Sequence, residues 1–307
     1  MKNWLKRHPK AFILVIVLVY LLAFVGTDIF FAVHSPADSS AETLDLAKIS
    51  EKLEKQEVSI ASVEDTQIQP VTLESIQSNH PETSVWNLLQ DLPEQVDPKD
   101  WKLQIVNELF PLKEDITSPL YVGIDGQTYD ERIKESVQAF MDASEKENYK
   151  LKIVSAYRNL ATQTANYQSY KQVYLQQGLS PEEAEKKARE YVAPPKTSEH
   201  SLGLALDIVT QQWDQGGKGL VEDFAETPEA QWMKTHAKDY GFILRYLKGR
   251  EKETGYQFEP WHFRYVGKEA ADYIDRHGLT LEEYVVLVYA KNGIELTYKV
   301  DEDLKVE

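Results

Sequence analysis

The stretch SEHSLGLALDIV, residues 198–209, contains the clearest structural signal in the chain. Its apolar residues Leu204, Leu206 and Ile208 alternate with their neighbours, which predicts a strand with one buried face. On such a strand Asp207 faces away from these apolar residues. We therefore expect a strand over 204–209 whose open face forms one wall of a cleft.

A second polar cluster, EPWHFR, begins at Glu259. A catalytic zinc ion takes three protein ligands and keeps one position for water or substrate, and two imidazoles with one carboxylate form such a set. We expect His200, Asp207 and His262 to hold Zn²⁺, with Glu259 as the general base three residues before His262. Either cluster alone is also compatible with a buried structural histidine. The two together favour a metal site.

The remaining histidines are not expected to have a catalytic role. They lie in tails, in a linker, on a predicted helix surface or at a helix end: His8, His34, His80, His236 and His277.

Short strands and helices alternate around these clusters without a regular strand–helix–strand repeat. Strands are predicted over 103–106, 152–157, 242–246 and 263–266, and helices over 133–141, 161–177, 181–191, 228–240, 268–276 and 280–289. This order favours the α+β class, with a small central antiparallel sheet flanked by helices.

The N-terminus resembles a membrane anchor. Residues 1–10 are basic, and residues 11–33 are mostly apolar, which predicts a single-pass transmembrane signal-anchor whose basic tail is cytoplasmic. A cleaved signal peptide is the alternative. We expect a cell-membrane protein with its catalytic domain on the outer, cell-wall side.

Composition sets the other expected boundaries. Residues 34–97 are acidic and polar and predict an extracellular linker, 98–292 a catalytic domain, and 293–307 an acidic C-terminal tail. The chain has no cysteine, which excludes disulfides and thiolate metal sites. Its net charge of −16 argues against nucleic acid as a partner.

The motif S-x-H-x-x-G-x-A-x-D followed by E-x-W-H resembles the signature of VanY-type D-alanyl-D-alanine carboxypeptidases, a family of zinc metallopeptidases. The resemblance covers about 101–288. Further matching segments are SAYR at 155–158 with Gln163, YGFILRY at 240–246, EPWHFRYVG at 259–267 and LEEY at 281–284. The departures are Ala156, Asn159 and Leu247, none of which is an expected ligand.

This resemblance implies a fold shared with Hedgehog-type signalling domains and a role in removing terminal D-alanine from peptidoglycan stem peptides. It implies zinc ligation by His200, Asp207 and His262, catalysis by Glu259, and substrate contacts from Arg158, Gln163 and Ser198. Arg158 suits either the developing oxyanion or the substrate carboxylate, and the sequence leaves that choice open.

Three alternatives remain at this point. The enzyme could be an L,D-carboxypeptidase acting on tetrapeptide stems, or an endopeptidase that cuts within peptidoglycan. It could also be a non-catalytic zinc-containing module that binds the cell wall. The presence of Glu259 argues against the last, because a binding module has no need of a general base.

Overall fold

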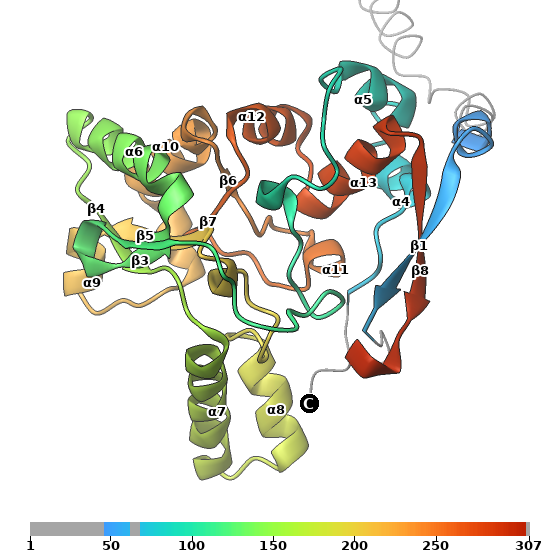
Figure 1. The fold of residues 1–307 in the computed structure, drawn as a ribbon. Coiled ribbons are helices and arrows are strands. Elements are labelled where there is room, and N and C mark those ends of the chain that lie inside the picture. The colour runs from blue at the N-terminus through green and yellow to red at the C-terminus, as the bar shows by residue number, and fades with distance from the viewer. Residues whose placement is uncertain (1–45, 62–67, 305–307) are drawn as a thin grey trace, which may run out of the picture. The chain divides into compact units, whose positions relative to one another are not determined.

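The computed structural model describes residues 46–61 and 68–304. The chain divides into two units, Met1–Glu51 and Lys52–Glu307. Every element named below belongs to the second unit (Figure 1).

A four-stranded antiparallel sheet, of strand order β4-β5-β7-β6, lies at the centre of this unit. Its strands are β4 (Leu151–Ser155), β5 (Ala205–Thr210), β6 (Phe242–Leu244) and β7 (His262–Tyr265). A short antiparallel pair is formed by β2 (Leu120–Val122) and β3 (Thr128–Asp130). The central sheet confirms the α+β class expected from the sequence.

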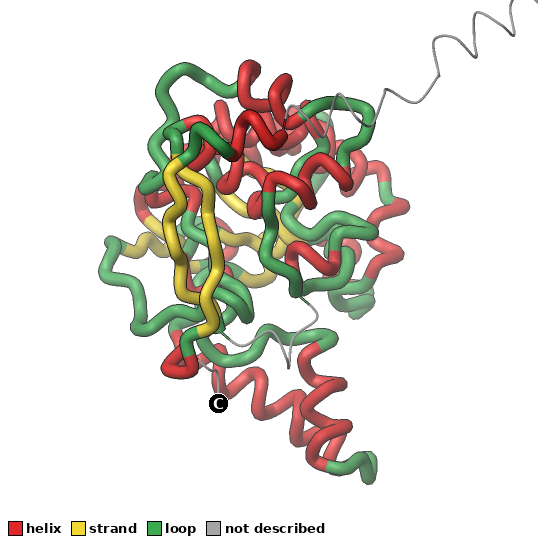
Figure 2. Tube along the Cα trace, turned by 90° about the vertical axis from the view of Figure 1, so that its right-hand side faces the viewer, coloured by secondary structure: helices red, strands yellow, loops and turns green. Residues whose placement is uncertain are grey.

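Helices surround the sheet (Figures 1 and 2). The α-helices are α4 (Leu73–Asn79), α5 (Val85–Asp91), α6 (Lys134–Lys146), α7 (Leu160–Gln176), α8 (Pro181–Arg189), α9 (Gln211–Gln215), α10 (Pro228–His236), α11 (Glu251–Thr254), α12 (Lys268–His277) and α13 (Leu281–Lys291). The short 3₁₀ turns used below are η1 (Trp101–Leu103), η4 (Glu199–Leu202) and η6 (Ala237–Tyr240). The helices predicted from 133 onward are confirmed, with small shifts at their ends.

The main core lies on the face of the sheet that α6 covers. Phe140 of α6 is fully buried, and its ring centroid lies 5.7 Å from that of Phe242 and 6.0 Å from that of Phe263. Leu206 and Ile208 of β5 belong to the same cluster. Each such side chain contributes roughly 1.5–3 kcal/mol by leaving water. The opposite face of β5 carries Asp207.

Helices α7 and α8 form a hairpin that projects from the rest of the unit (Figures 1 and 2). The predicted start of α8 is confirmed: Ser180 Oγ accepts a hydrogen bond from the amide of Glu183, and the Glu183 carboxylate accepts one from the amide of Ser180. The base of the hairpin carries Gln163, so it is attached beside the candidate site.

Residues 52–61 and 68–97 are not the linker expected from their composition. They form β1 (Glu54–Ile60), α4 and α5, whose buried side chains include Ile76 and Leu88. The expected acidic tail likewise contains β8 (Ile294–Val300), which pairs in parallel with β1. We call β1, α4, α5 and β8 the terminal layer. The expected catalytic domain, 98–292, is therefore too short at both ends. Composition did not indicate the terminal layer, because its apolar residues stand among many polar ones in the sequence.

The strand predicted over 103–106 is wrong. Its first residue, Leu103, is the last residue of η1, and residues 104–106 belong to no strand. The backbone carbonyls of Lys102 and Gln104 instead accept hydrogen bonds from Arg264 Nη2, each at 2.9 Å. A side chain therefore satisfies groups that a neighbouring strand would otherwise pair.

The expected membrane helix, residues 11–33, lies outside the described residues. Within the part of the chain that the structure describes, no helix combines the length and the apolar character needed to cross a membrane. This finding contradicts the prediction that the chain is a single-pass membrane protein. The membrane is therefore not retained as a partner.

Candidate metal centre and substrate site

Three strands place polar side chains in one row across the open face of the sheet. Ser155 of β4 pairs with Asp207 of β5, and Asp207 pairs with His262 of β7. Residues paired directly on antiparallel strands point to the same face. Leu206 and Ile208, on either side of Asp207, point into the core. The alternation predicted from the sequence is confirmed.

His200 reaches this row from the turn η4. Ser198 Oγ begins the turn by accepting a hydrogen bond from the amide of His200 at 3.3 Å, and Ser198 itself is buried. Gly203 ends the turn with φ at 69°, a left-handed conformation that favours glycine. His200 Nδ1 donates to the carbonyl of Ala156 at 2.7 Å. That bond fixes the tautomer and leaves Nε2 as the ligand atom.

His200, Asp207 and His262 converge, with one possible ligand atom from each within 4.8 Å of the others. His200 Nε2 lies 3.2 Å from Asp207 Oδ2, and His262 Nδ1 lies 3.2 Å from Asp207 Oδ1. Asp207 Oδ1 is buried and has no hydrogen-bond partner among the described residues. A buried carboxylate oxygen left in this way is costly unless a cation neutralises it. Two imidazoles and one carboxylate fit a zinc ion.

The protonation of the cluster follows from burial and neighbouring charge. Burial lowers the pKa of His200 to about 4, and the Arg158 guanidinium adds to this effect. Burial also disfavours the charged form of His262, but the carboxylates of Asp207 and Glu199 outweigh it and raise the pKa of His262 to about 9. Burial opposes ionisation of Asp207, yet the two imidazoles hold its pKa well below the ordinary value. Zinc binding through His262 Nδ1 requires that nitrogen to be unprotonated.

Glu259 lies in the loop before β7, beside this cluster. Its backbone carbonyl accepts a hydrogen bond from the amide of His262 at 3.1 Å, and its Oε2 lies 3.5 Å from His262 Nδ1. About a fifth of its side chain is exposed, at 20%. Burial raises the pKa of Glu259 to about 7. A carboxyl group that exchanges its proton near neutral pH, within reach of solvent, has the properties of a general base.

Arg158 is held at the edge of the cluster by two side chains. Its Nε donates to Gln163 Oε1 at 2.9 Å, and its Nη1 donates to Ser155 Oγ at 2.7 Å. Gln163 in turn donates to the carbonyl of Ala193 at 2.7 Å and is fully buried. The predicted pair Arg158 and Gln163 is thus brought together, with Gln163 orienting the guanidinium.

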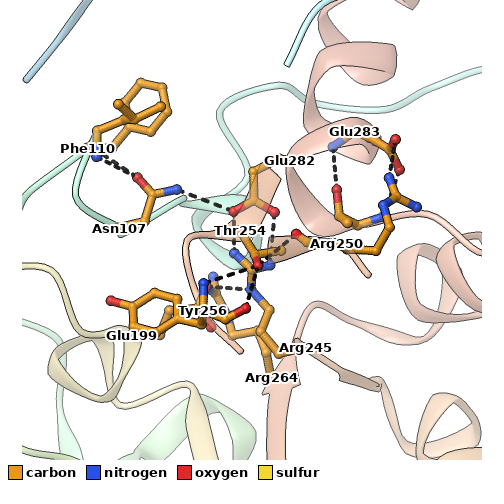
Figure 3. Close-up of polar contacts among 12 residues, drawn as sticks. Asn107, Phe110, Glu199, Arg245, Arg250, Thr254, Tyr256, Arg264, Glu282 and Glu283 are labelled. Atoms are coloured by element: carbon orange, nitrogen blue, oxygen red, sulfur yellow. Dashed lines mark hydrogen bonds and ion pairs between the residues drawn. The ribbon is translucent and has the colours of Figure 1, made fainter. Parts of the chain in front are cut away.

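Sequence reasoning missed a network of four buried charged residues, one of which, Glu199, lies 3.6 Å from His262. Figure 3 shows the network, which consists of Glu199, Arg245, Arg264 and Glu282. Glu199 Oε1 accepts hydrogen bonds from Arg245 Nε at 2.8 Å and from Arg264 Nη1 at 2.7 Å. Arg245 also donates to both carboxylate oxygens of Glu282, at 2.9 and 2.6 Å. Two positive and two negative groups balance one another. The available signal was a charged residue within or directly after a short strand, as at Arg264 in β7 and Arg245 after β6.

Comparison with known proteins places this arrangement in a family. The family model for VanY, D-alanyl-D-alanine carboxypeptidase, matches residues 126–268. A protein of Bacillus subtilis (strain 168), described as putative carboxypeptidase YodJ, is 37% identical over 212 residues, which are 69% of this chain and 70% of that protein.

Two solved structures resemble the fold. The structure of a mutant of the vancomycin-resistance D,D-pentapeptidase VanY in complex with Zn(II) has a TM-score of 0.53 and 33% identity, and covers 60% of this chain and 99% of its own. The LD-carboxypeptidase LdcB has a TM-score of 0.52 and 32% identity, and covers 67% of this chain and 95% of its own. On its family match, its sequence identity and its fold, the chain belongs to the VanY family of D-alanyl-D-alanine carboxypeptidases.

Proposed function

We propose that the chain is a zinc-dependent carboxypeptidase that removes the terminal D-alanine from peptidoglycan stem peptides. The observation that carries the proposal is the buried cluster of His200, Asp207 and His262 with Glu259 at its open side. The VanY relative was solved with Zn(II), which supports the choice of metal. When bound, zinc would polarise the scissile carbonyl and lower the pKa of a water molecule.

The protein residues supply the proton transfer. Glu259, ionised, takes a proton from the attacking water at a carboxylate oxygen, because that side chain is partly exposed and its pKa lies near neutrality. It then gives this proton to the nitrogen of the leaving D-alanine. The backbone hydrogen bond from His262 to Glu259 holds the Glu259 backbone beside the cluster.

Arg158 provides the positive charge that a carboxypeptidase needs. Gln163 and Ser155 each accept one of its N–H groups, which leaves the others for a substrate. We propose that they bind the terminal carboxylate, because a guanidinium held at two points can offer a fixed pair of donors to it. Ser198 is proposed only to shape the turn around His200, since its side chain is buried there.

The preferred substrate is proposed to be a pentapeptide stem ending in D-Ala-D-Ala, as for the VanY relative described as a D,D-pentapeptidase. L,D-cleavage of tetrapeptide stems is the second candidate, because LdcB resembles this chain about as closely and is described as an LD-carboxypeptidase.

Mass spectrometry of tetrapeptide and pentapeptide stems incubated with the full chain tests the proposal. The full chain is needed because a fragment starting near residue 98 would lose β1, α4 and α5. We expect loss of one alanine from the pentapeptide, abolished by chelation and by Glu259→Gln. Loss from the tetrapeptide alone would move the assignment to L,D-cleavage, cleavage within the stem to an endopeptidase, and intact peptides with zinc bound to a binding module.

A further inference from the structure

The two imidazoles of the metal cluster differ in what surrounds the ring nitrogen that faces away from Asp207. His200 Nδ1 donates to a neutral backbone carbonyl, that of Ala156. His262 Nε2 is buried and has no hydrogen-bond partner among the described residues. The carboxylate of Glu199 lies close to that nitrogen, with its Oε2 3.6 Å away. Glu199 Oε2 is also buried without a hydrogen-bond partner there.

The Glu199 carboxylate is immobilised through its other oxygen. Glu199 Oε1 accepts from both Arg245 and Arg264, so rotation of the carboxylate would break two charge-assisted bonds (Figure 3). Both guanidinium groups are fully buried. With Oε1 fixed in this way, Oε2 is directed toward the ring of His262.

The two arginines are themselves held from elements outside the sheet. Glu282 of α13 accepts from Arg245 through both of its oxygens. Arg264 is held by the carbonyls of Lys102 and Gln104. The four side chains carry no net charge, and each buried charge has an opposite partner, which offsets the cost of removing it from water.

The ring of His262 is also confined by aromatic neighbours. The Tyr246 ring centroid lies 4.7 Å from that of His262, and the His200 ring stands nearly perpendicular to it at 5.0 Å. Its Nδ1 lies near the carboxylates of Asp207 and Glu259, and its Nε2 lies near that of Glu199.

We propose that Glu199 is a positioning residue whose Oε2 accepts a hydrogen bond from the Nε2–H group of His262, so that Nδ1 is presented to the metal in one tautomer and one orientation. The inference rests on the proposed function, because it takes His262 as a ligand. A carboxylate in this position strengthens the ligand histidine and orders its ring. Arg245 and Arg264 keep Glu199 ionised and immobile.

Zinc affinity, measured by chelator competition on the full chain, tests the inference without reference to activity. Glu199→Gln and Glu282→Gln form a matched pair, because each removes one negative charge from the same network but only Glu199 lies next to His262. We expect Glu199→Gln to weaken zinc binding by about 10–100-fold. Glu282→Gln should change it much less, and Glu199→Asp, which keeps the charge, should recover part of the loss.

Equal losses in the two glutamine variants would overturn the inference, because they would trace to charge imbalance alone. Unchanged zinc affinity in Glu199→Gln would also overturn it. Should Glu199→Gln fail to fold, the charge-balanced Glu199→Gln/Arg264→Gln variant replaces it, and wild-type zinc affinity there contradicts the inference. A wild-type chain that binds no zinc would instead overturn the proposed function and this inference with it.

Discussion

The sheet with its metal cluster and the terminal layer use buried polar groups in different ways. In the sheet, backbone register alone sets Asp207 opposite His262. In the terminal layer, α4 and α5 bury apolar side chains such as Ile76 and Leu88, and a buried polar contact joins His80 to Glu283 of α13. Two adjacent residues of α13 contact the two regions: Glu283 binds His80, and Glu282 binds Arg245 in the buried charge network. Changes in the sheet should therefore alter chemistry, and changes in the terminal layer should alter stability.

The largest expected effect is a loss of catalytic activity without a change in the stability of the fold. Glu259→Gln keeps the size of the side chain but removes its ability to take a proton, so kcat on the stem peptide should fall by about 10²–10⁴-fold. Steady-state kinetics measure this. The zinc content and the unfolding midpoint serve as controls and should stay near wild type. A variant within tenfold of the wild-type kcat would remove Glu259 from its proposed role.

The converse change falls in the terminal layer. Leu88 of α5 is 1% exposed, and Leu88→Ala should lower the free energy of unfolding by about 2–5 kcal/mol through lost burial and a cavity. Trp86 on the same helix is 45% exposed, so Trp86→Ala is the matched control, with an effect of about 0.5 kcal/mol or less. Denaturant unfolding measures both.

At a temperature where Leu88→Ala remains folded, its kcat should equal that of the wild type. A large loss of kcat at unchanged stability would contradict the separation of the two regions.

The contrast between regions also explains what could be predicted from sequence. The three expected zinc ligands and Glu259 lie in two short motifs. The residue types and spacing within these motifs are enough to predict a metal site with a general base. The terminal layer has no such signal: β1 and β8 come from opposite ends of the described chain, and α4 and α5 have only seven residues each. The layer is also joined to α13 by contacts between residues far apart in the sequence, such as His80 with Glu283, which are 203 residues apart.

The buried charge network could not be predicted from the sequence for a related reason. Glu199, Arg245, Arg264 and Glu282 lie in four separate segments, and single charged residues are by default solvated. Only the fold shows that they neutralise one another. Glu199 stood inside the quoted motif, yet its neighbour His200 carried the recognisable pattern.

A smaller effect is expected at the substrate end of the site. Arg158→Lys keeps the charge but loses the two-point contact with Gln163 and Ser155, so the cation is no longer held in place. We expect kcat/KM for the stem peptide to fall by roughly 10–100-fold. Zinc affinity should not change. Kinetics equal to wild type would show that the carboxylate is bound elsewhere.

The smallest expected effect is a pH dependence confined to the terminal layer. The hydrogen bond to Glu283 raises the pKa of His80 above its ordinary value, against the effect of burial. Protonated His80 therefore stabilises the fold below about pH 6.5, and this contribution is lost as the pH rises through the folded-state pKa. His80→Gln should cost about 1 kcal/mol at acidic pH and less at alkaline pH.

Urea unfolding of wild type and His80→Gln at about pH 6 and about pH 9 measures the difference. A stability difference that grows with pH would have the wrong sign for this ion pair.

The most direct test of the metal centre is zinc K-edge X-ray absorption of the full chain loaded with one equivalent of Zn²⁺. The structure predicts a nearest shell of nitrogen and oxygen atoms with outer scattering from two imidazole rings, those of His200 and His262, and a changed spectrum in Asp207→Asn. A spectrum without two imidazoles, or one that Asp207→Asn leaves unaltered, would contradict the assignment of these three residues as the zinc site.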